Sequence, residues 1–340
     1  MKTLLNEITS VCGYSNNCPS SNKTTTNRFN AQTYNYNHEF YGTNTNSSEI
    51  RRVDLEQCEH SCVVAHRNTV KVAEFFENHL NGFKKSERTG YISCIYCQDS
   101  QNHQAFWSPS YGRAVFGTKQ LTNGNFCSYA ISATTVAHEF GHKLICETII
   151  KGEGKGFDYE SKQSGALEES YADIFAILFV NRNQPNIGQW DWEIGNGFGL
   201  NGPALRDVRS PRTYDDPDHM RDYINLPTDL SGDWNGCHTN NGIHNKALYY
   251  LLNSKVKDGK YIRYLFDVSS AVKLFYLALT ELKTKNKANF EDSLNALIKA
   301  SRILSQRGEI INNQREVEDA VIRSFAQVGI LQPKRADYSL

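Results

Sequence analysis

The residues in this sequence that are best suited to metal binding and catalysis are two histidines and a glutamate in the segment HEFGH, His138 to His142. The histidines are four residues apart in a helical pattern, so their rings lie on one helix face and can reach a single tetrahedral metal ion. Glu139 lies about a quarter-turn round from His138, because a helix has about 3.6 residues per turn. Its carboxylate is therefore expected beside the water that the metal activates, as a base, and not on the metal itself. The alternative interpretation is a helix that carries these side chains on its surface without a metal.

A third ligand is expected from the next helical segment, because a catalytic zinc takes three protein ligands and leaves a fourth position open. Residues 164–175, SGALEESYADIF, contain the acids Glu168, Glu169 and Asp173. Spacing alone does not choose between the two glutamates, but only Glu169 has an acid four residues later. Asp173 can accept the second ring N–H of a zinc histidine and fix its tautomer. The apolar residues around these acids favour a buried site over a solvated helix face.

Four segments of the chain differ in composition and periodicity. Residues 1–26 are rich in Asn, Ser and Thr and predict a polar tail. Residues 27–131 predict a β-rich domain with one helix at 65–80, and residues 132–150 predict the central helix that carries HEFGH. Residues 151–335 predict a helical domain, with a long loop region at 183–237 and helices at 165–182, 241–254, 268–283, 289–305 and 314–328. The expected fold class is α+β, with a cleft between the β-rich and helical parts.

Charge and hydropathy disfavour two classes of function. Lys plus Arg and Asp plus Glu number 37 each, so no net charge points to nucleic acid or to an anionic membrane. No apolar run approaches the roughly 20 residues of a membrane-spanning helix. The N-terminus lacks the apolar core of a secretory signal. Nine cysteines are nevertheless many for a reducing compartment, so we expect a secreted protein even though no signal peptide is visible in this sequence.

Three pairs of cysteines are close in sequence, namely Cys12/Cys18, Cys58/Cys62 and Cys94/Cys97. Local disulfides in an exported protein are the favoured interpretation. Free thiols are one alternative that the spacing leaves open. A second metal site is another, built from Cys58, Cys62, Cys94 and Cys97.

Several blocks of the sequence together resemble the thermolysin-type neutral metalloproteases, over about residues 27–331. They are QAFWSP at 104–109, TTVAHEFGHKL at 134–144, SGALEESYADIF at 164–175, PALRDVRSP with DDPDHM at 203–220, DWNGCHTNNGIHNKALYYL at 233–251 and ANFEDSLNALIKA at 288–300. Such blocks in the family's order are more specific than HEFGH alone. The resemblance implies a zinc metalloendopeptidase, with Glu139 as general base and Zn²⁺ on His138, His142 and Glu169.

The same resemblance assigns further catalytic side chains. It implies that His238 donates a hydrogen bond to the tetrahedral oxyanion, and that Asp233 holds the imidazole and keeps it protonated. Tyr159 corresponds to the second oxyanion donor, and Arg206 to a clamp on the substrate carbonyl beyond the scissile bond. The competing interpretations are a loop histidine bonded to backbone, a loop tyrosine and a surface ion pair.

Substrate-binding positions follow from the same blocks. Gln104 stands where the family usually has an Asn that binds substrate backbone, and Ala105 follows it. The pocket for the residue after the cleaved bond corresponds to Phe126, Ile194 and Leu205. The resemblance implies a preference for bulky apolar residues in that pocket. The expected partners are protein or peptide substrates, and we expect a monomer.

The chain departs from the family pattern in its spacing and at its calcium positions. KGEGKG lengthens the stretch between His142 and Glu169. Asp191 and Glu193 remain, but the family's paired calcium site lacks carboxylates at Thr134, Val180 and Asn196. Because Ca²⁺ takes many oxygen ligands, we expect the paired calcium site to be absent.

Two rival functions and one regulatory idea remain open. A zinc exopeptidase would share the metal geometry but needs an acidic residue that binds the free amine of its substrate, and no such motif stands out. A catalytically silent protein that keeps the fold would bind zinc without cleaving unfolded protein. Cys12 or Cys18 in the tail could also bind the open zinc position as a thiolate and hold the enzyme latent.

Overall fold

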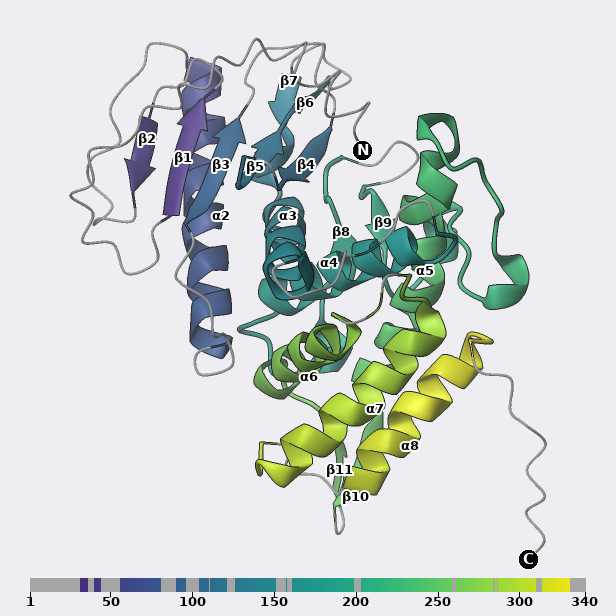
Figure 1. Ribbon diagram of the computed structural model, residues 1–340. Coiled ribbons are helices and arrows are strands. Elements are labelled where there is room, and N and C mark those ends of the chain that lie inside the picture. The colour runs from purple at the N-terminus through teal and green to yellow at the C-terminus, as the bar shows by residue number, and fades with distance from the viewer. Residues whose placement is uncertain are drawn as a thin grey trace, which may run out of the picture.

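The computed structural model describes most of the chain between residues 31 and 330 (Figure 1). The described residues are 31–35, 40–43, 56–80, 90–95, 104–109, 111–120, 126–150, 157, 161–198, 203–258, 261–283, 285, 287–309 and 314–330. A small sheet-containing N-terminal region precedes a mainly helical C-terminal region (Figure 1). The predicted α+β class is therefore confirmed. The predicted tail at 1–26 lies outside the described residues, and the domain boundaries stay a prediction.

The N-terminal region is built on a mixed sheet of short strands. The strands are β1 (Ala31–Asn35), β2 (Phe40–Thr43), β3 (Tyr91–Ile95), β4 (Ala105–Ser108) and β5 (Arg113–Phe116). Their order in the sheet is β2-β1-β3-β5-β4, with β1, β3 and β5 parallel and the outer strands antiparallel. A separate two-stranded hairpin of β6 (Thr118–Gln120) and β7 (Phe126–Ser128) follows β5. β5 is buried along its whole length, as an interior strand requires.

Helix α2, Glu56–His79, packs along the sheet (Figure 1). Its buried face includes Val72, Phe75 and Phe76, each at most 3% exposed. The predicted helix at 65–80 is confirmed but was too short, because α2 begins at Glu56. The added residues 56–64 are mostly polar and carry a weak apolar period, so periodicity did not reveal them.

Helix α3, Ala133–Ile145, is the central element and contacts both the sheet region and the next α-helix of the chain (Figure 1). The Ser132 hydroxyl caps it by accepting a bond from the Thr135 N–H (3.3 Å). The helical backbone continues to residue 150, the end of the predicted helix, with Cys146–Ile150 as a π-helical turn. The Thr148 hydroxyl donates to the Leu144 carbonyl (2.7 Å). Such a bond competes with the backbone for that acceptor.

Helix α4, Ser164–Val180, approaches α3 closely at a glycine. A Cβ atom added to Gly141 would lie 2.9 Å from Cα of Ala172, closer than real Cβ contacts. The glycine therefore permits the close contact between the two helices, and this contact sets Glu169 on α4 beside the histidines of α3.

Among its described residues the C-terminal region has four further α-helices, α5 (Asp233–Leu252), α6 (Val268–Leu282), α7 (Phe290–Gln306) and α8 (Gln314–Gln327). The last three match their predicted ranges to within one residue, while α5 begins eight residues before the predicted start at 241. The hairpin of β10 (Lys255–Asp258) and β11 (Tyr261–Tyr264) follows α5. No described helix has the length and hydropathy to cross a membrane.

The predicted loop region at 183–237 contains more structure than expected. A two-stranded ribbon pairs β8 (Glu193–Ile194) with β9 (Arg206–Asp207). These strands are too short to give a period-2 pattern. The first residues of α5 also belong to this stretch, and the next subsection describes them because they carry site residues.

Candidate active site

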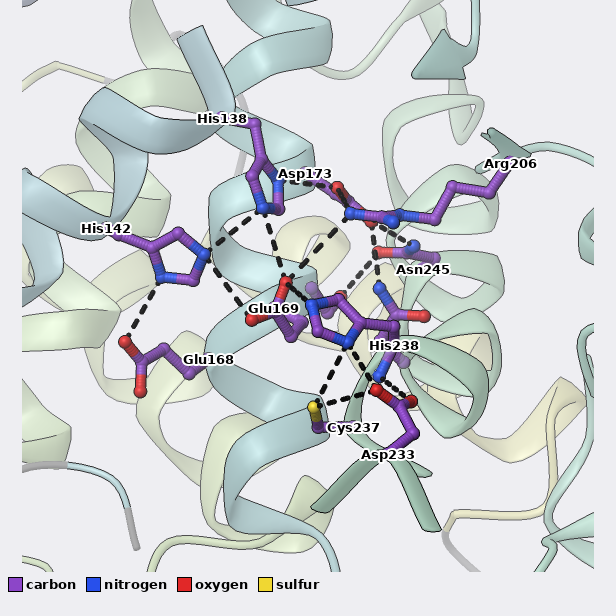
Figure 2. A network of polar contacts seen from close by, with 12 residues as sticks. His138, His142, Glu168, Glu169, Asp173, Arg206, Asp233, Cys237, His238 and Asn245 are labelled. Atoms are coloured by element: carbon purple, nitrogen blue, oxygen red, sulfur yellow. Dashed lines mark hydrogen bonds and ion pairs between the residues drawn. The ribbon is translucent and has the colours of Figure 1, made fainter. Parts of the chain in front are cut away.

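Two histidines and a glutamate converge where α3 faces α4 (Figure 2). His138 and His142 come from α3 and Glu169 comes from α4, and one ligand atom of each lies within 4.8 Å of the others. The two Nε2 atoms are 3.1 Å apart, and the rings are nearly perpendicular at 85°. The carboxylate of Glu169 lies 3.3 Å from Nε2 of His138 and 3.4 Å from Nε2 of His142. All three side chains are buried.

Each histidine is held at its other ring nitrogen by an acid (Figure 2). Nδ1 of His138 lies 2.8 Å from Oδ1 of Asp173, and Nδ1 of His142 lies 3.1 Å from Oε1 of Glu168. An ionised carboxylate only accepts hydrogen bonds, so both Nδ1 atoms carry the proton. The sequence favoured Glu169 over Glu168 as the metal ligand, and the structure places Glu168 behind His142.

This arrangement fits Zn²⁺. With Nδ1 protonated, each neutral ring presents a lone pair at Nε2, and the two lone pairs face each other at 3.1 Å beside a carboxylate. A metal ion bound between these lone pairs would remove their mutual repulsion. Two histidines and a glutamate, with further carboxylates behind the rings, are the donor set of catalytic zinc sites.

Asp173 is fully buried and is surrounded by N–H donors. Arg206 donates to it twice, from Nε to Oδ2 (2.7 Å) and from Nη2 to Oδ1 (2.8 Å). The amides of Asn241 and Asn245 each donate to Oδ2 at 2.9 Å. Burial alone would raise the pKa of Asp173, but Arg206 and His138 hold that pKa well below its usual range. The carboxylate is therefore ionised and forms a close ion pair with Nδ1 of His138 (2.8 Å).

Glu139 is buried next to the metal ligands. Its Oε2 has no hydrogen-bond partner among the described residues. Burial raises the pKa of Glu139, and the rings of His138 and His142 offset this only in part. A carboxylate with a free oxygen and a raised pKa is suited to take up a proton and release it again.

His238 and Asp233 form a pair at the start of α5. Nδ1 of His238 lies 2.6 Å from Oδ1 of Asp233, and the His238 backbone N–H donates to Oδ2 (2.8 Å). Nε2 of His238 points to the metal centre, 3.4 Å from Oε2 of Glu169 (Figure 2). Burial lowers the pKa of His238, but the charge of Glu169 and the bond to Asp233 raise that pKa well above its usual value. The ring is therefore a donor at Nε2.

A left-handed turn of the backbone brings this pair together. Asp233, Trp234 and Asn235 have φ angles of 51°, 50° and 72°, and Gly236 has 68°. Left-handed conformations cost non-glycine residues on the order of 1 kcal/mol each. The turn folds the carboxylate of Asp233 back onto the N–H and ring of His238. Strain of this kind is common at functional sites.

The β8–β9 ribbon places three of the predicted substrate-contacting residues next to one another. Ile194 on β8 pairs with Arg206 on β9, and the backbone N–H of Leu205 donates to the carbonyl of Ile194 (2.8 Å). A Cβ added to Gly195 would lie 2.5 Å from Cδ1 of Leu205, so the leucine side chain folds over the ribbon. Ile194 is 2% exposed. Arg206 extends from this ribbon to Asp173 (Figure 2).

The other predicted site residues are described in part or not at all. Gln104 is exposed and precedes Ala105, the first residue of the edge strand β4, which contacts α3. Phe126 begins β7, and its side chain lies outside the description. Tyr159 lies outside the described residues.

The cysteine predictions also fall largely outside the description. The side chains of Cys58 and Cys62, both on α2, are not described, and Cys12, Cys18 and Cys97 are not described at all. The Sγ of Cys94 accepts a hydrogen bond from Arg113 (3.7 Å).

The positions of the family's paired calcium site make direct hydrogen bonds. The Thr134 hydroxyl accepts a bond from the Gly195 N–H (2.9 Å). The Asn196 amide donates to Asp191 (3.1 Å). The hydroxyl of Tyr214 donates to Glu193 (3.0 Å). Val180 ends α4 and offers no oxygen ligand from its side chain. The expected absence of the calcium pair stays a prediction.

Sequence reasoning missed three residues at this site. Asn241 and Asn245, one turn apart on α5, bind Asp173, and their four-residue spacing was the only signal available. Cys237 is buried beside the His238–Asp233 pair, with Sγ 3.3 Å from Nδ1 of His238 (Figure 2). Nothing in the sequence around it indicated this contact.

Comparisons with known proteins place this site in a family. The thermolysin metallopeptidase catalytic domain matches residues 8–145, which includes much of the predicted tail, and the thermolysin metallopeptidase alpha-helical domain matches residues 156–330. Bacillolysin of Bacillus amyloliquefaciens is 33% identical over 245 residues, which are 72% of this chain and 41% of that protein. Neutral protease NprE of Bacillus pumilus is 31% identical over 258 residues, 76% of this chain and 75% of that protein.

A solved structure supports the same assignment at the level of the fold. It is the precursor of protealysin, a metalloproteinase from Serratia proteamaculans, with a TM-score of 0.66 and 22% identity over 92% of this chain and 91% of that one. This chain spans less than half the length of the bacillolysin that it matches. From the matches along its length, this chain belongs to the thermolysin family of metallopeptidases.

Proposed function

We propose that this chain is a zinc metalloendopeptidase that hydrolyses internal bonds of protein or peptide substrates. The observation that carries the proposal is the convergence of both Nε2 atoms, from His138 and His142, on the carboxylate of Glu169. A zinc ion bound there supplies a Lewis acid that polarises the scissile carbonyl group and makes water easier to deprotonate. Membership of the thermolysin family supports the same activity.

Glu139 is the proton carrier in this proposal. Its Oε2 is buried and has no hydrogen-bond partner in the described part of the chain, so it is available to take a proton from the attacking water. The raised pKa of Glu139 makes that protonated state accessible. The same oxygen then delivers the proton to the leaving nitrogen of the cleaved bond.

His238 and Tyr159 stabilise the oxyanion. The Nδ1 proton of His238 is held by Asp233, so a protonated ring keeps its second N–H, at Nε2, for the oxyanion. The raised pKa of His238 supports a protonated ring at neutral pH. Tyr159 is assigned the second donation on the strength of the family resemblance alone.

Arg206 acts as the clamp on the substrate carbonyl beyond the scissile bond. Its Nε and one Nη2 hydrogen are used by Asp173. Arginine carries five N–H groups in a planar fork, so the remaining N–H groups are available for a carbonyl oxygen. The carboxylate of Asp173 thus orients both the clamp Arg206 and the zinc ligand His138.

Substrate selection rests on the β8–β9 ribbon and on β4. Ile194 and Leu205, next to the arginine clamp, support a pocket for a bulky apolar residue after the cleaved bond, with Phe126 as its third wall. Gln104 and Ala105 at the sheet edge are assigned to the substrate backbone. We also propose that the enzyme is exported and that it is a monomer. The high cysteine count supports the export.

Cleavage of a denatured protein, and of an internal peptide blocked at both ends, tests this function. The expected result is cutting before bulky apolar residues, as read by mass spectrometry. Ortho-phenanthroline should abolish it, its non-chelating meta isomer should not, and added zinc should restore it. Cleavage that requires a free amino terminus would instead indicate an exopeptidase. Zinc binding without any cleavage would indicate a silent protein.

A further inference from the structure

A line of buried polar side chains connects the metal centre to the interior of the helical region. Its members come from α4, α5 and α7 and are at most 1% exposed, namely Ser170, Asp173, His244, Asn245 and Ser293. Asn245 donates to Asp173 (2.9 Å), and the Ser170 hydroxyl donates to Oδ1 of Asn245 (2.6 Å). His244 lies between two hydroxyls, with Nδ1 2.7 Å from Oγ of Ser170 and Nε2 2.9 Å from Oγ of Ser293.

The direction of these hydrogen bonds follows from Asp173. Its carboxylate only accepts, so the amide nitrogen of Asn245 faces it and the amide oxygen faces Ser170. That oxygen also only accepts, so the single hydroxyl proton of Ser170 goes to Asn245. The oxygen of Ser170 must then accept the bond from His244, whose Nδ1 therefore carries the proton.

The opposite edge of the His244 ring agrees with this assignment. A neutral ring protonated at Nδ1 has a lone pair at Nε2, which accepts the hydroxyl proton of Ser293. The hydroxyl of Tyr171, 2.9 Å from Oγ of Ser293, then donates to that oxygen. With the reversed tautomer, Ser170 would donate to His244, and two oxygens 2.6 Å apart would face each other without a proton.

Aromatic rings hold His244 in this orientation. Its ring stacks on Phe290 with centroids 5.5 Å apart at 24° and meets the edge of Phe325 at 5.4 Å and 80°. Phe290 lies on α7 and Phe325 on α8. Together with α5, which carries His244, and α4, which carries Ser170, four helices fix the ring. Rotation of the ring to exchange its two nitrogens would require these contacts to break.

We propose that His244 is a positioning residue of the metal centre. It donates from Nδ1 to Ser170, which commits the Ser170 proton to Asn245 and keeps the Asn245 amide on Asp173. Asp173 in turn holds the Nδ1 proton of His138. The inference rests on the proposed zinc function, and it adds a residue remote from the metal that tunes zinc affinity.

A matched pair of substitutions separates this role from packing. In His244→Asn the new amide nitrogen occupies the place of Nδ1 and keeps the donation to Ser170. In His244→Gln the amide group occupies the place of Nε2, so the contact with Ser293 is kept and the donation to Ser170 is lost. Zinc affinity is measured on metal-free protein by competition with a chromogenic chelator.

Loss of a hydrogen-bond partner behind a metal ligand typically weakens metal binding about 10- to 100-fold. We expect His244→Gln to weaken zinc binding about tenfold, at the lower end of that range, and His244→Asn to change it by less than about threefold. A role in packing alone predicts the opposite order, because glutamine is closer to histidine in size. Equal affinities in both variants, or a larger loss in His244→Asn, would overturn the proposal.

The tautomer itself is measured on the unsubstituted protein, so the test does not depend on a variant that folds. Nitrogen-15 NMR of labelled histidine rings distinguishes protonation at Nδ1 from protonation at Nε2. We expect His244 to be a single Nδ1–H tautomer in the zinc-bound protein, and an Nε2–H ring there would overturn the proposal.

Substitutions on α7 provide a further control for the tautomer. Ser293→Ala removes the proton donor to Nε2 and is expected to shift the Nε2 resonance, while the ring stays an Nδ1–H tautomer because the bond to Ser170 is kept. Ser301 is also buried on α7, but its hydroxyl donates to the carbonyl of Ile298 within the helix (2.7 Å). Ser301→Ala is therefore expected to leave the His244 spectrum unchanged, and equal spectra for the two variants would contradict the proposal.

The failure of this proposal is distinguishable from failure of the zinc function. If the unsubstituted protein binds zinc and cleaves peptides but the His244 pair shows equal affinities, only the positioning role is wrong. If the unsubstituted protein binds no zinc, both the function and the positioning role are wrong.

Discussion

Nδ1 of His138 and Oδ1 of Asp173 lie 2.8 Å apart, with the carboxylate fully shielded from solvent. This contact fixes which nitrogen of the ring faces the metal. Asp173→Asn keeps the shape and removes the charge, and is expected to weaken zinc binding about 10- to 100-fold. Chelator competition measures the affinity, and Asp319→Asn on the exposed face of α8 is the matched control. An unchanged affinity in Asp173→Asn would show that the carboxylate does not orient His138.

Glu139→Gln is expected to remove peptidase activity and keep the metal. The amide fills the same space but cannot take a proton, and general-base catalysis contributes about 100- to 10,000-fold. Turnover of an internally quenched peptide gives the activity, and elemental analysis gives the zinc content. Full turnover in this variant would exclude Glu139 as the base.

His238→Gln is expected to lower kcat about 100- to 1000-fold with little change in KM. Loss of one donor to the oxyanion has that cost when the donor acts mainly in the transition state. Steady-state kinetics on one peptide separates the two parameters. A rise in KM at constant kcat would instead show that His238 binds the substrate in its ground state.

The free energy of unfolding is expected to decrease as the pH is lowered, because the ring of His244 is buried. Burial lowers the pKa of His244 to about 3, whereas an unfolded histidine titrates near about 6.5. Between about pH 6.5 and 3, His244 therefore binds a proton in the unfolded chain but not in the folded chain. The free energy of unfolding therefore falls as the pH drops from about 6.5 toward 3, by up to about 1.4 kcal/mol per pH unit from this residue.

Urea denaturation at fixed zinc concentration checks this pH dependence. His244→Asn has no titrating ring at this position, so its free energy of unfolding should decline less steeply between pH 7 and 5 than that of the unsubstituted protein. Parallel slopes would show that the ring is protonated in the folded state.

Added calcium is expected to leave the melting temperature unchanged. A ligand that binds only the folded state raises stability with its concentration, and the direct hydrogen bonds at Thr134, Asn196 and Glu193 leave few oxygens for Ca²⁺. Differential scanning calorimetry with and without millimolar calcium measures the effect, with magnesium as the control ion. A rise specific to calcium would show that Asp191 and Glu193 still hold an ion.

The sequence revealed the parts of the site that depend on local spacing. His138 and His142 share a helix face because of their four-residue interval, and the interval from Glu169 to Asp173 singled out one of two glutamates. The structure adds what spacing cannot show. Glu168, the rejected candidate, lies behind His142 because successive helical residues point about 100° apart.

Long-range contacts account for most of the remaining gaps. Asn241, Asn245 and His244 reach α4 only because α5 packs on it, and no pattern within α5 specifies that neighbour. The left-handed turn from Asp233 to Gly236 hides the start of α5 from periodicity. The helical segments with strong apolar periods were placed to within a residue or two, because the period itself marks the buried face of each helix.

The contact at Gly141 and Ala172 fixes how closely α3 and α4 approach each other. The relative position of the ligands is set by backbone meeting backbone at that point, and not by the number of residues that join α3 to α4. KGEGKG can thus be inserted at 151–156 without moving Glu169 away from the histidines.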